Sequence, residues 1–262
     1  MAGTTAGTTA GTTAGSPART PASSPAGATG AQTAAAVPDR PADGTAWFHL
    51  TSHQARLQLW PQKAAFDPDR GLLLVADAHL GKAVSFRRLG VPVPEATTDE
   101  ALARLDGLIA ATGASGIVFL GDLLHSARAH AIGTMAAVAA WRQRHSGLNL
   151  TLVRGNHDQH AGAPPAALGV QVVDGPLRIG PWACVHQPEA VPGAYALAGH
   201  VHPCAVLRGR AGDRLRLPSF HFGPTGAVLP AFGPFTGMHA LPAGAGVRRY
   251  AVAGTSVQAL PD

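Results

Sequence analysis

The chain has 262 residues, of which 46% are hydrophobic, and this is enough for one domain with a full apolar core. Its formal net charge is +5 with only 13% charged residues, and the excess is arginine, which suits a polyanionic partner. No apolar run approaches the roughly 20 residues that a membrane-crossing helix needs, so no membrane span is expected.

The amino-terminal segment, residues 1–45, differs in composition from the rest of the chain. It begins with repeats of AGTT, continues in Pro, Ala, Ser and Thr, and contains no aromatic residue. Such a segment cannot bury enough apolar surface to offset its ordering entropy, and it lacks the basic start and apolar stretch of a secretory signal. We therefore expect a disordered low-complexity tail over residues 1–45 and a single domain over residues 46–262.

Strands and helices alternate in the first half of the predicted domain. The strands have short apolar runs, and the later ones are apolar throughout, which is typical of burial on both faces of a sheet. They are expected at 47–52, 55–61, 71–77, 116–122 and 148–156. The helices have apolar residues three or four positions apart, and the first has a capping box from Thr97 to Glu100 and a terminating Gly113. They are expected at 97–113 and 127–145.

Short strands with little helix follow residue 170. They are expected at 170–174, 177–186, 195–199, 205–210, 214–220 and 247–253. Alternating strands and helices followed by a run of strands indicate two sheets packed face to face with helices outside. Within this run, residues 208–217 are expected to form a hairpin with Arg214 and Arg216 outward and Leu215 and Leu217 inward. The segment VLPAFGPFTG, residues 228–237, is too rich in Pro and Gly for a regular element and is expected to be a loop.

The two cysteines, Cys184 and Cys204, form no CxxC pair. Small buried thiols in a reduced, cytoplasmic protein are the expected interpretation, ahead of a disulfide.

Five apolar runs end in residue types that bind metals. The residues concerned are Asp77 and His79, Asp122, Asn156 with His157 and Asp158, His186, and His200 with His202. Because the carboxyl ends of neighbouring parallel strands lie along one edge of a sheet, these side chains are expected to meet in one cleft. Carboxylates, imidazoles and an amide without a thiolate suit Mn²⁺, Fe or Zn²⁺ better than Ca²⁺. The donors exceed what one ion needs, so two divalent ions bridged by a carboxylate are predicted, Mn²⁺ before Fe or Zn²⁺.

These motifs also carry a family resemblance. DAH, GD, GNHD, a lone His and GHVH, in this order, resemble the motif set of the calcineurin-like metallophosphoesterases. The segments ADAHLGKAVSFRRLGVPVP, GHVHPCAVLRG and VLPAFGPFTG are similar to the bacterial DNA ligase-associated phosphoesterases known as PdeM. The resemblance extends from about Trp47 to the end, and it implies a four-layer αββα sandwich of two mixed sheets flanked by helices.

The resemblance assigns seven ligands to two metal ions. One ion would be held by Asp77, His79 and His202, the other by Asn156, His186 and His200, with Asp122 bridging both. Two ions about 3.5–4 Å apart share a water and bring its pKa near neutral, so a di-metal-bound hydroxide would attack the phosphodiester.

Three residues beside the Asn156 ligand are given catalytic roles. His157 would face the scissile phosphate and act as an acid, and Asp158 would accept a hydrogen bond from its ring. Arg154 is a candidate phosphate contact. Lys82, Arg87 and Arg88 could clamp the phosphate or form an ordinary solvated helix face, and His125 is expected in the cleft.

Three functions remain open from the sequence. The first is a metal-dependent phosphodiesterase, an endonuclease of DNA repair that acts on single-stranded or damaged DNA beside a DNA ligase and a helicase. The second is the same chemistry on a small substrate, such as a cyclic nucleotide, a nucleotide-linked pyrophosphate or a phosphomonoester. The third is a non-catalytic scaffold with the same fold.

Overall fold

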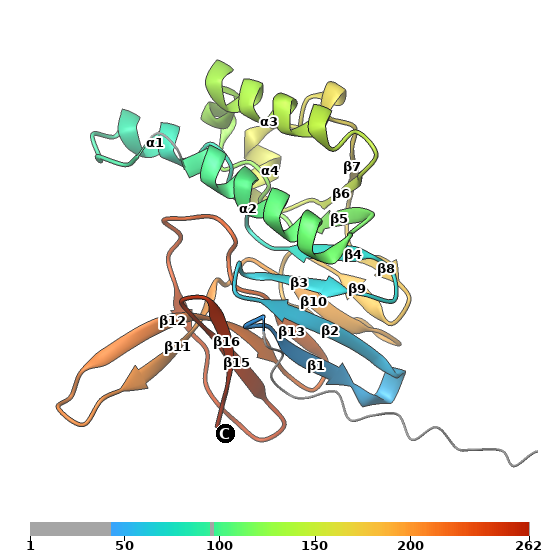
Figure 1. Cartoon of the computed structure of the whole chain (residues 1–262), viewed down its shortest axis with the longest axis vertical. Helices are drawn as coiled ribbons and strands as arrows, with labels where there is room; N and C mark the ends of the chain where they lie inside the picture. The colour runs from blue at the N-terminus through green and yellow to red at the C-terminus, as the bar shows by residue number, and fades with distance from the viewer. Residues whose placement is uncertain (1–42, 95–96, 262) are drawn as a thin grey trace, which may run out of the picture. The chain divides into compact units, whose positions relative to one another are not determined.

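A mixed sheet of seven strands, β1 to β7, occupies the first part of the computed structural model, which describes residues 43–94 and 97–261 (Figure 1). Its strands lie in chain order, with antiparallel pairing from β1 to β4 and parallel pairing from β4 to β7. Their bounds are Ala46–Leu50, Ala55–Trp60, Ala64–Asp67, Leu72–Val75, Gly116–Phe119, Asn149–Val153 and Val170–Val173. The three predicted buried strands are β4, β5 and β6, and their carboxyl ends therefore lie at one edge.

The helices of the described residues all fall between β1 and β7. They are α1 Lys82–Arg88, α2 Thr97–Thr112, α3 Ile132–Arg144 and α4 Asn156–Ala161, with 3₁₀ turns at Thr51–His53, Ala127–His130 and Ala166–Leu168. The predicted helix over 127–145 was wrong in its first turn, because Ala131 has an extended ψ of 140° that separates the 3₁₀ turn from α3. Helix α2 ends as expected, with Gly113 at a φ of +65°.

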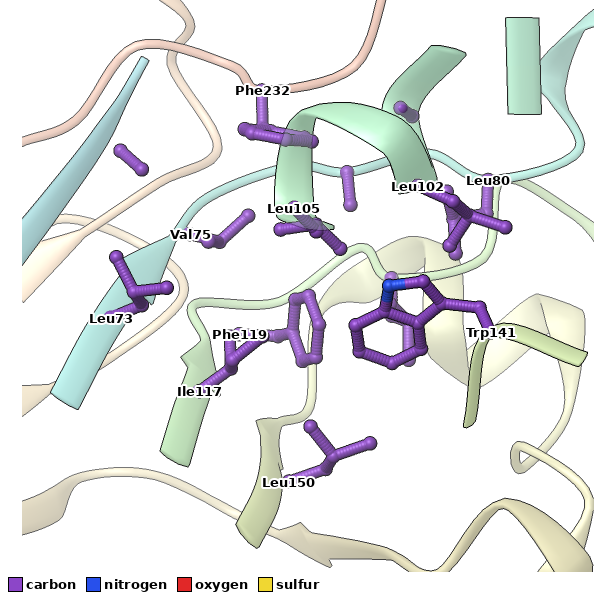
Figure 2. Close-up of a cluster of buried hydrophobic side chains, with 14 of the residues drawn as sticks. Leu73, Val75, Leu80, Leu102, Leu105, Ile117, Phe119, Trp141, Leu150 and Phe232 are labelled. Carbon is purple, nitrogen blue, oxygen red and sulfur yellow. The ribbon is translucent and has the colours of Figure 1, made fainter. Parts of the chain in front are cut away.

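Helices α2 and α3 cover one face of the first sheet. Figure 2 shows the apolar cluster that lies between these helices and the sheet. Leu73, Ile117 and Leu150 come from the neighbouring strands β4, β5 and β6. Trp141 of α3 and Leu105 of α2 pack onto them, and both are almost fully buried. This core holds helices α2 and α3 in a fixed position relative to the carboxyl ends of β4, β5 and β6.

A second mixed sheet of nine strands follows. Its strands β8 to β16 have the bounds Leu177–Ile179, Trp182–Cys184, Tyr195–Ala198, Pro203–Arg208, Arg214–Phe222, Gly226–Val228, His239–Ala240, Arg248–Ala253 and Ser256–Leu260. The order is β14-β11-β12-β13-β10-β9-β8, with β15 paired to β12 and β16 to β15. Strands β9, β10 and β13 are parallel, whereas β11 and β12 form an antiparallel hairpin.

The two sheets pack face to face through a second apolar cluster. Leu74 and Val118 of the first sheet share this cluster with Trp182 and Phe220 of the second. The predicted fold class is therefore confirmed as α/β, with two mixed sheets in a sandwich and helices beside them. Among the described residues, the stretch from Val170 to Pro261 contains only strands and loops, so the helical cover lies on the first sheet.

The amino-terminal boundary of the folded region lies close to the predicted one. The predicted tail up to residue 42 falls outside the described residues, but residues 43–45 are tied to the domain. Thr45 is fully buried and donates its backbone N–H and hydroxyl to Asp43 Oδ1, at 3.0 and 2.7 Å. Gly44 O accepts a backbone hydrogen bond from Val257.

Both cysteines are buried and free, as expected. In residues 43–94 and 97–261, no helix combines the length and the apolar character that crossing a membrane requires.

Candidate metal centre

The predicted ligands follow strand ends and come together in space. Asp77 lies two residues after β4, Asp122 three residues after β5, and Asn156 opens helix α4 three residues after β6. His186 follows β9, and His200 lies between β10 and β11. The segments after β4 and β5 run side by side, because the N–H of His79 donates to Asp122 O at 2.9 Å. The cluster thus lies where edges of both sheets meet.

The backbone at this cluster adopts a left-handed conformation repeatedly. Five of the seven predicted ligands have a positive φ: Asp77 at 50°, His79 at 45°, Asp122 at 51°, His200 at 69° and His202 at 53°. This region is uncommon for residues other than glycine and costs on the order of 1–3 kcal/mol per residue. Such corners turn each ligand out of its strand direction and toward its neighbours.

Glycines next to the ligands make the close approach possible. A Cβ at Gly121 would collide with the ring Nδ1 of His186, and one at Gly155 would collide with the carboxylate of Asp122. At Gly199, a Cβ would lie 2.7 Å from Asp77 Oδ2. The glycines that precede Asp122, Asn156 and His200 are therefore required by space.

The first predicted ligand group is buried. Asp77, His79 and His202 offer ligand atoms that all lie within 4.8 Å of one another. Asp77 Oδ1 is 3.7 Å from His202 Nε2, and the side chains of Asp77 and His79 are 0% and 1% exposed. Since Nδ1 of His202 donates to the carbonyl of Gly237 at 3.1 Å, its Nε2 keeps a lone pair directed at the cluster.

The second predicted group is tighter and more open to solvent. Asn156 Oδ1 lies 2.8 Å from His186 Nε2 and 3.0 Å from His200 Nδ1, and the two ring nitrogens are 3.1 Å apart. His186 donates its Nδ1–H to Leu120 O at 3.0 Å, which leaves Nε2 as an acceptor. His200 is exposed, whereas His186 is buried.

Asp122 lies between the two groups. Its Oδ1 is 3.5 Å from His186 Nε2, and its Oδ2 is 4.0 Å from His79 Nε2. Each oxygen therefore faces a different set of donors, which is the arrangement a bridging carboxylate needs.

The donor atoms fit divalent ions. Burial lowers the pKa of His79 and raises the pKa of Asp122, so both groups have lost water that a bound cation would replace. Nδ1 of His79 and Nε2 of His202 are buried without a hydrogen-bond partner in the described part of the chain. The clustered imidazoles and carboxylates could hold a metal ion.

His157 stands at the open side of the cluster. Its side chain is 39% exposed, and its Nε2 lies 3.9 Å from Asp122 Oδ2. The predicted hydrogen bond from its ring to Asp158 was wrong, because Nδ1 of His157 donates instead to the carbonyl of His125 at 2.9 Å. That carbonyl fixes the tautomer and leaves Nε2 directed at the site.

Asp158 instead organises the backbone beneath the cluster. Its carboxylate accepts N–H bonds from Asp122 at 2.7 Å, Leu123 at 3.0 Å, Leu124 at 3.3 Å and Gly155 at 2.9 Å. The sequence could not distinguish this role, since a carboxylate one residue after a histidine can reach either partner.

Lys82 and His125 line the same side as His157. Burial lowers the pKa of Lys82, and the charges of Asp77 and Asp122 act on it in the opposite direction. Burial, and next the charge of Lys82, lower the pKa of His125 to about 4, and its ring stacks on His157 with centroids 5.1 Å apart. Phe86 lies between these two groups, with its ring 5.6 Å from Lys82 Nζ and 6.4 Å from the His125 centroid.

The other predicted cations lie farther out. Arg154 forms an exposed ion pair with Asp174 at 3.4 Å. Arg87 donates to Pro94 O at 3.4 Å and lines a cavity with Asp99, and Arg88 is exposed on α1. Of the three basic residues of this helix, Lys82 is the one whose pKa is raised by the charges of Asp77 and Asp122, against the larger effect of burial.

The irregular segment 229–233 supports the first ligand. Ala231 bridges to Ala76, and the N–H of Gly233 donates to Asp77 O at 3.0 Å. Arg104 of α2 holds this loop through a 2.8 Å hydrogen bond to Phe232 O, with its guanidinium 4.2 Å from the Phe232 ring centroid. Sequence reasoning missed this support, although the Pro and Gly content of the loop indicated that it was irregular.

Comparisons with known proteins agree with this geometry. Neither the family models nor the curated proteins gave a match. The crystal structure of the Pseudomonas putida nuclease MPE is similar to this chain at 41% sequence identity and a TM-score of 0.73, covering 82% of this chain and 100% of that one. YfcE, a phosphoesterase from E. coli, aligns at 14% identity and a TM-score of 0.35 over 71% of this chain and 95% of its own. The chain therefore belongs to the metallophosphoesterase family, hydrolases that act on ester bonds, together with the Pseudomonas putida nuclease.

Proposed function

We propose that the protein is a metal-dependent phosphodiesterase that cleaves DNA as an endonuclease. The proposal rests on one observation, which is that Asp122 lies between two groups of candidate metal ligands. Each group contains imidazole nitrogens and a side-chain oxygen. The Oδ1 of Asp122 lies 3.5 Å from His186 Nε2, and its Oδ2 lies 4.0 Å from His79 Nε2. A site that holds two cations around one carboxylate suits the hydrolysis of phosphate esters.

In this proposal, Asp77, His79 and His202 hold one ion, Asn156, His186 and His200 hold the other, and Asp122 contacts both. Bound there, the ions would activate a water for attack on phosphorus and neutralise the phosphate oxygens. Mn²⁺ is our first candidate, ahead of Fe or Zn²⁺.

The residues of the open side act on the substrate. His157 presents Nε2 toward the site while its Nδ1–H is held by His125 O, so its protonated ring can donate a proton to the departing oxygen. Lys82 offers a positive charge to the phosphate, and the charges of Asp77 and Asp122 raise its pKa against the larger effect of burial. His125 stacks on His157 and adds a ring beside the bound ester.

Four further residues complete the proposed roles. Arg154 would have to leave its exposed ion pair with Asp174 to contact a phosphate. Arg87 and Arg88 would meet a longer substrate on α1. Asp158 contributes through the backbone that it holds, and in this sense remains part of the catalytic machinery.

We infer the substrate class from similarity and charge. The Pseudomonas putida protein to which the chain is 41% identical is described as a nuclease, and arginine dominates the net charge of +5. Single-stranded or damaged DNA, in a cytoplasmic repair set with a DNA ligase and a helicase, is the proposed setting.

Circular single-stranded DNA tests the proposal directly. The protein loaded with Mn²⁺, Fe²⁺ or Zn²⁺ is incubated with the circle and, in parallel, with a small phosphodiester. Linear product supports the endonuclease. An intact circle alongside hydrolysis of the small diester points to a small-substrate phosphoesterase, and inactivity on both with no bound metal points to a scaffold.

A further inference from the structure

Strands β11 and β12 form an arm that extends from the second sheet, running to the lower left of Figure 1. We define the β11–β12 arm as residues 203–218. Beyond Cys204 on one strand and before Ser219 on the other, its residues pair only with each other among the described strands. Leu207 and Leu215 are 39% and 55% exposed, so the inward position predicted for Leu215 was wrong.

The two faces of the arm have different chemistry. Directly opposed residues of an antiparallel pair share a face, and successive residues alternate. Leu207 therefore shares a face with Leu215, and Arg208 shares the other face with Arg214. Arg210 lies in the connecting turn. From 208 to 216 the chain carries four arginines and one aspartate, a net charge of +3, against +5 for the whole protein.

Three of these four arginines have no ion-pair partner among the described residues, and the fourth is held by the main chain. Arg216 is anchored by the carbonyl of Met238. Within the described ranges, Arg208, Arg210 and Arg214 have no protein carboxylate within ion-pair distance. Arg208 lies directly opposite Arg214, and like charges at such a pair are destabilising. An anion bound between them would remove this repulsion.

The arm is continuous with the candidate metal centre. Strand β11 begins at Pro203, the residue after the predicted ligand His202. Arg208 lies six positions beyond His202, so a strand at about 3.3 Å per residue places it roughly 20 Å away. A stacked strand rises about 3.4 Å per nucleotide, so this distance corresponds to at most roughly six nucleotides, and to fewer in an extended strand.

We propose that the β11–β12 arm binds the sugar-phosphate backbone of a single-stranded nucleic acid whose reacting phosphate lies at the metal cluster. The inference rests on the proposed function and specifies its substrate, a polynucleotide long enough to reach from the cluster to Arg208, Arg210 and Arg214. A small phosphodiester would occupy the cluster without touching the arm.

The test compares two triple variants of the full chain with bound metal. The first is Arg208→Gln with Arg210→Gln and Arg214→Gln. The control carries the same change of charge at exposed or partly exposed arginines outside the arm: Arg56→Gln, Arg144→Gln and Arg178→Gln. Each protein is assayed on bis(p-nitrophenyl) phosphate, on a dinucleotide that is too short to reach the arm and on a long single-stranded DNA, at several salt concentrations.

We expect the arm variant to lose activity on the long DNA but not on the short substrates. Its kcat/KM on the long DNA should also depend less on salt than that of the wild type. Each lost phosphate contact lowers the salt slope by about 0.7, so three contacts lower it by about 2. Between about 50 and 200 mM salt, the wild type should then lose roughly 20-fold more kcat/KM than the arm variant. Bis(p-nitrophenyl) phosphate hydrolysis should stay within about 2-fold.

Three outcomes overturn the inference, and they are distinguishable. If the wild type cleaves long DNA and both triple variants show its salt slope, the arm does not bind the strand while the proposed function stands. If the wild type hydrolyses bis(p-nitrophenyl) phosphate and leaves all DNA intact, the proposed function fails and the inference fails with it. Loss of bis(p-nitrophenyl) phosphate activity in the arm variant would also contradict the proposal.

Discussion

The metal cluster has a buried half and an open half, and they are built differently. The buried half is Asp77, His79, Asp122 and His186, whose side chains are at most 5% exposed. The open half is Asn156, His157 and His200, of which His157 is 39% exposed. The buried half contains the negative charges of two carboxylates, which a bound cation would balance. The open half is accessible to solvent and to an incoming ester. Of the open half, Asn156 and His200 are also proposed ligands, so His157 is the residue whose loss should impair substrate chemistry without impairing metal binding.

The largest effect is expected from Asp122→Asn, which breaks the buried half at its centre. The amide cannot supply two anionic oxygens, so metal content and hydrolysis should both fall, the latter by at least about 100-fold. Metal analysis and the kcat/KM of a small phosphodiester measure both. Asp106→Asn is the matched control, because Asp106 pairs with Arg144 and His145 on the helical side. Retained metal and wild-type kcat in Asp122→Asn would contradict the bridging role.

His157→Ala tests the open half alone. Loss of a general acid typically costs about 10²–10⁴-fold in rate, and the metal content should not change. The kcat is measured beside metal analysis, with His49→Ala, an exposed histidine of β1, as the control. A variant that loses its metal would show that the two halves are not separable.

Asp158→Ala separates the backbone role of this carboxylate from a direct action on His157. Four backbone N–H groups would lose a buried acceptor, so we expect the free energy of unfolding to fall by at least about 3 kcal/mol. Chemical denaturation measures it, with the 82% exposed Asp174→Ala as the control. Unchanged stability would contradict the backbone role assigned to Asp158.

Metal removal should destabilise the protein through the buried half. At a free metal concentration about 100 times its Kd, binding contributes about 2.7 kcal/mol, or roughly 5–10 °C in Tm for a domain of this size. Thermal unfolding with chelator and after metal is restored measures the shift. The same titration on Asp122→Asn should show a much smaller shift, and an equal one would place the metal elsewhere.

The smallest effect is expected at Arg104, which reaches the buried half only through the loop around Phe232. Arg104→Met removes a charged hydrogen bond and a cation–π contact and should lower the free energy of unfolding by about 1–2 kcal/mol. Activity should decline only a few-fold. Arg144→Met on α3 is the control, and an identical loss in both variants would mean that the loop contact is unimportant.

Particular residues explain how much the sequence could predict. The strands β4, β5 and β6 and the residues after them were predictable, because buried parallel strands are apolar throughout and place their ends at one edge. The break at Ala131 was not, since alanine favours a helix and only tertiary packing imposes its extended ψ. The exposure of Leu215 was also not predictable, because alternation identifies two faces without saying which is covered.

The same reasoning applies within the cluster. The residue types and their order along the chain were enough to predict that Asp77, Asp122 and His200 share one site. The hydrogen-bond partner of the His157 ring could not be predicted, because it is a main-chain carbonyl and every residue has one. Support from Phe232 and Arg104 was hidden for a similar reason, since it depends on a contact across 128 positions of chain.

The five ligand positions with positive φ have a consequence for anyone who wishes to transplant this centre into another scaffold. Copying the side chains onto regular strands would point them in the wrong directions, since each depends on a sharp backbone corner, and Asp122 and His200 also depend on a preceding glycine. A successful graft would have to carry those corners as units, together with the main-chain contacts that keep them bent.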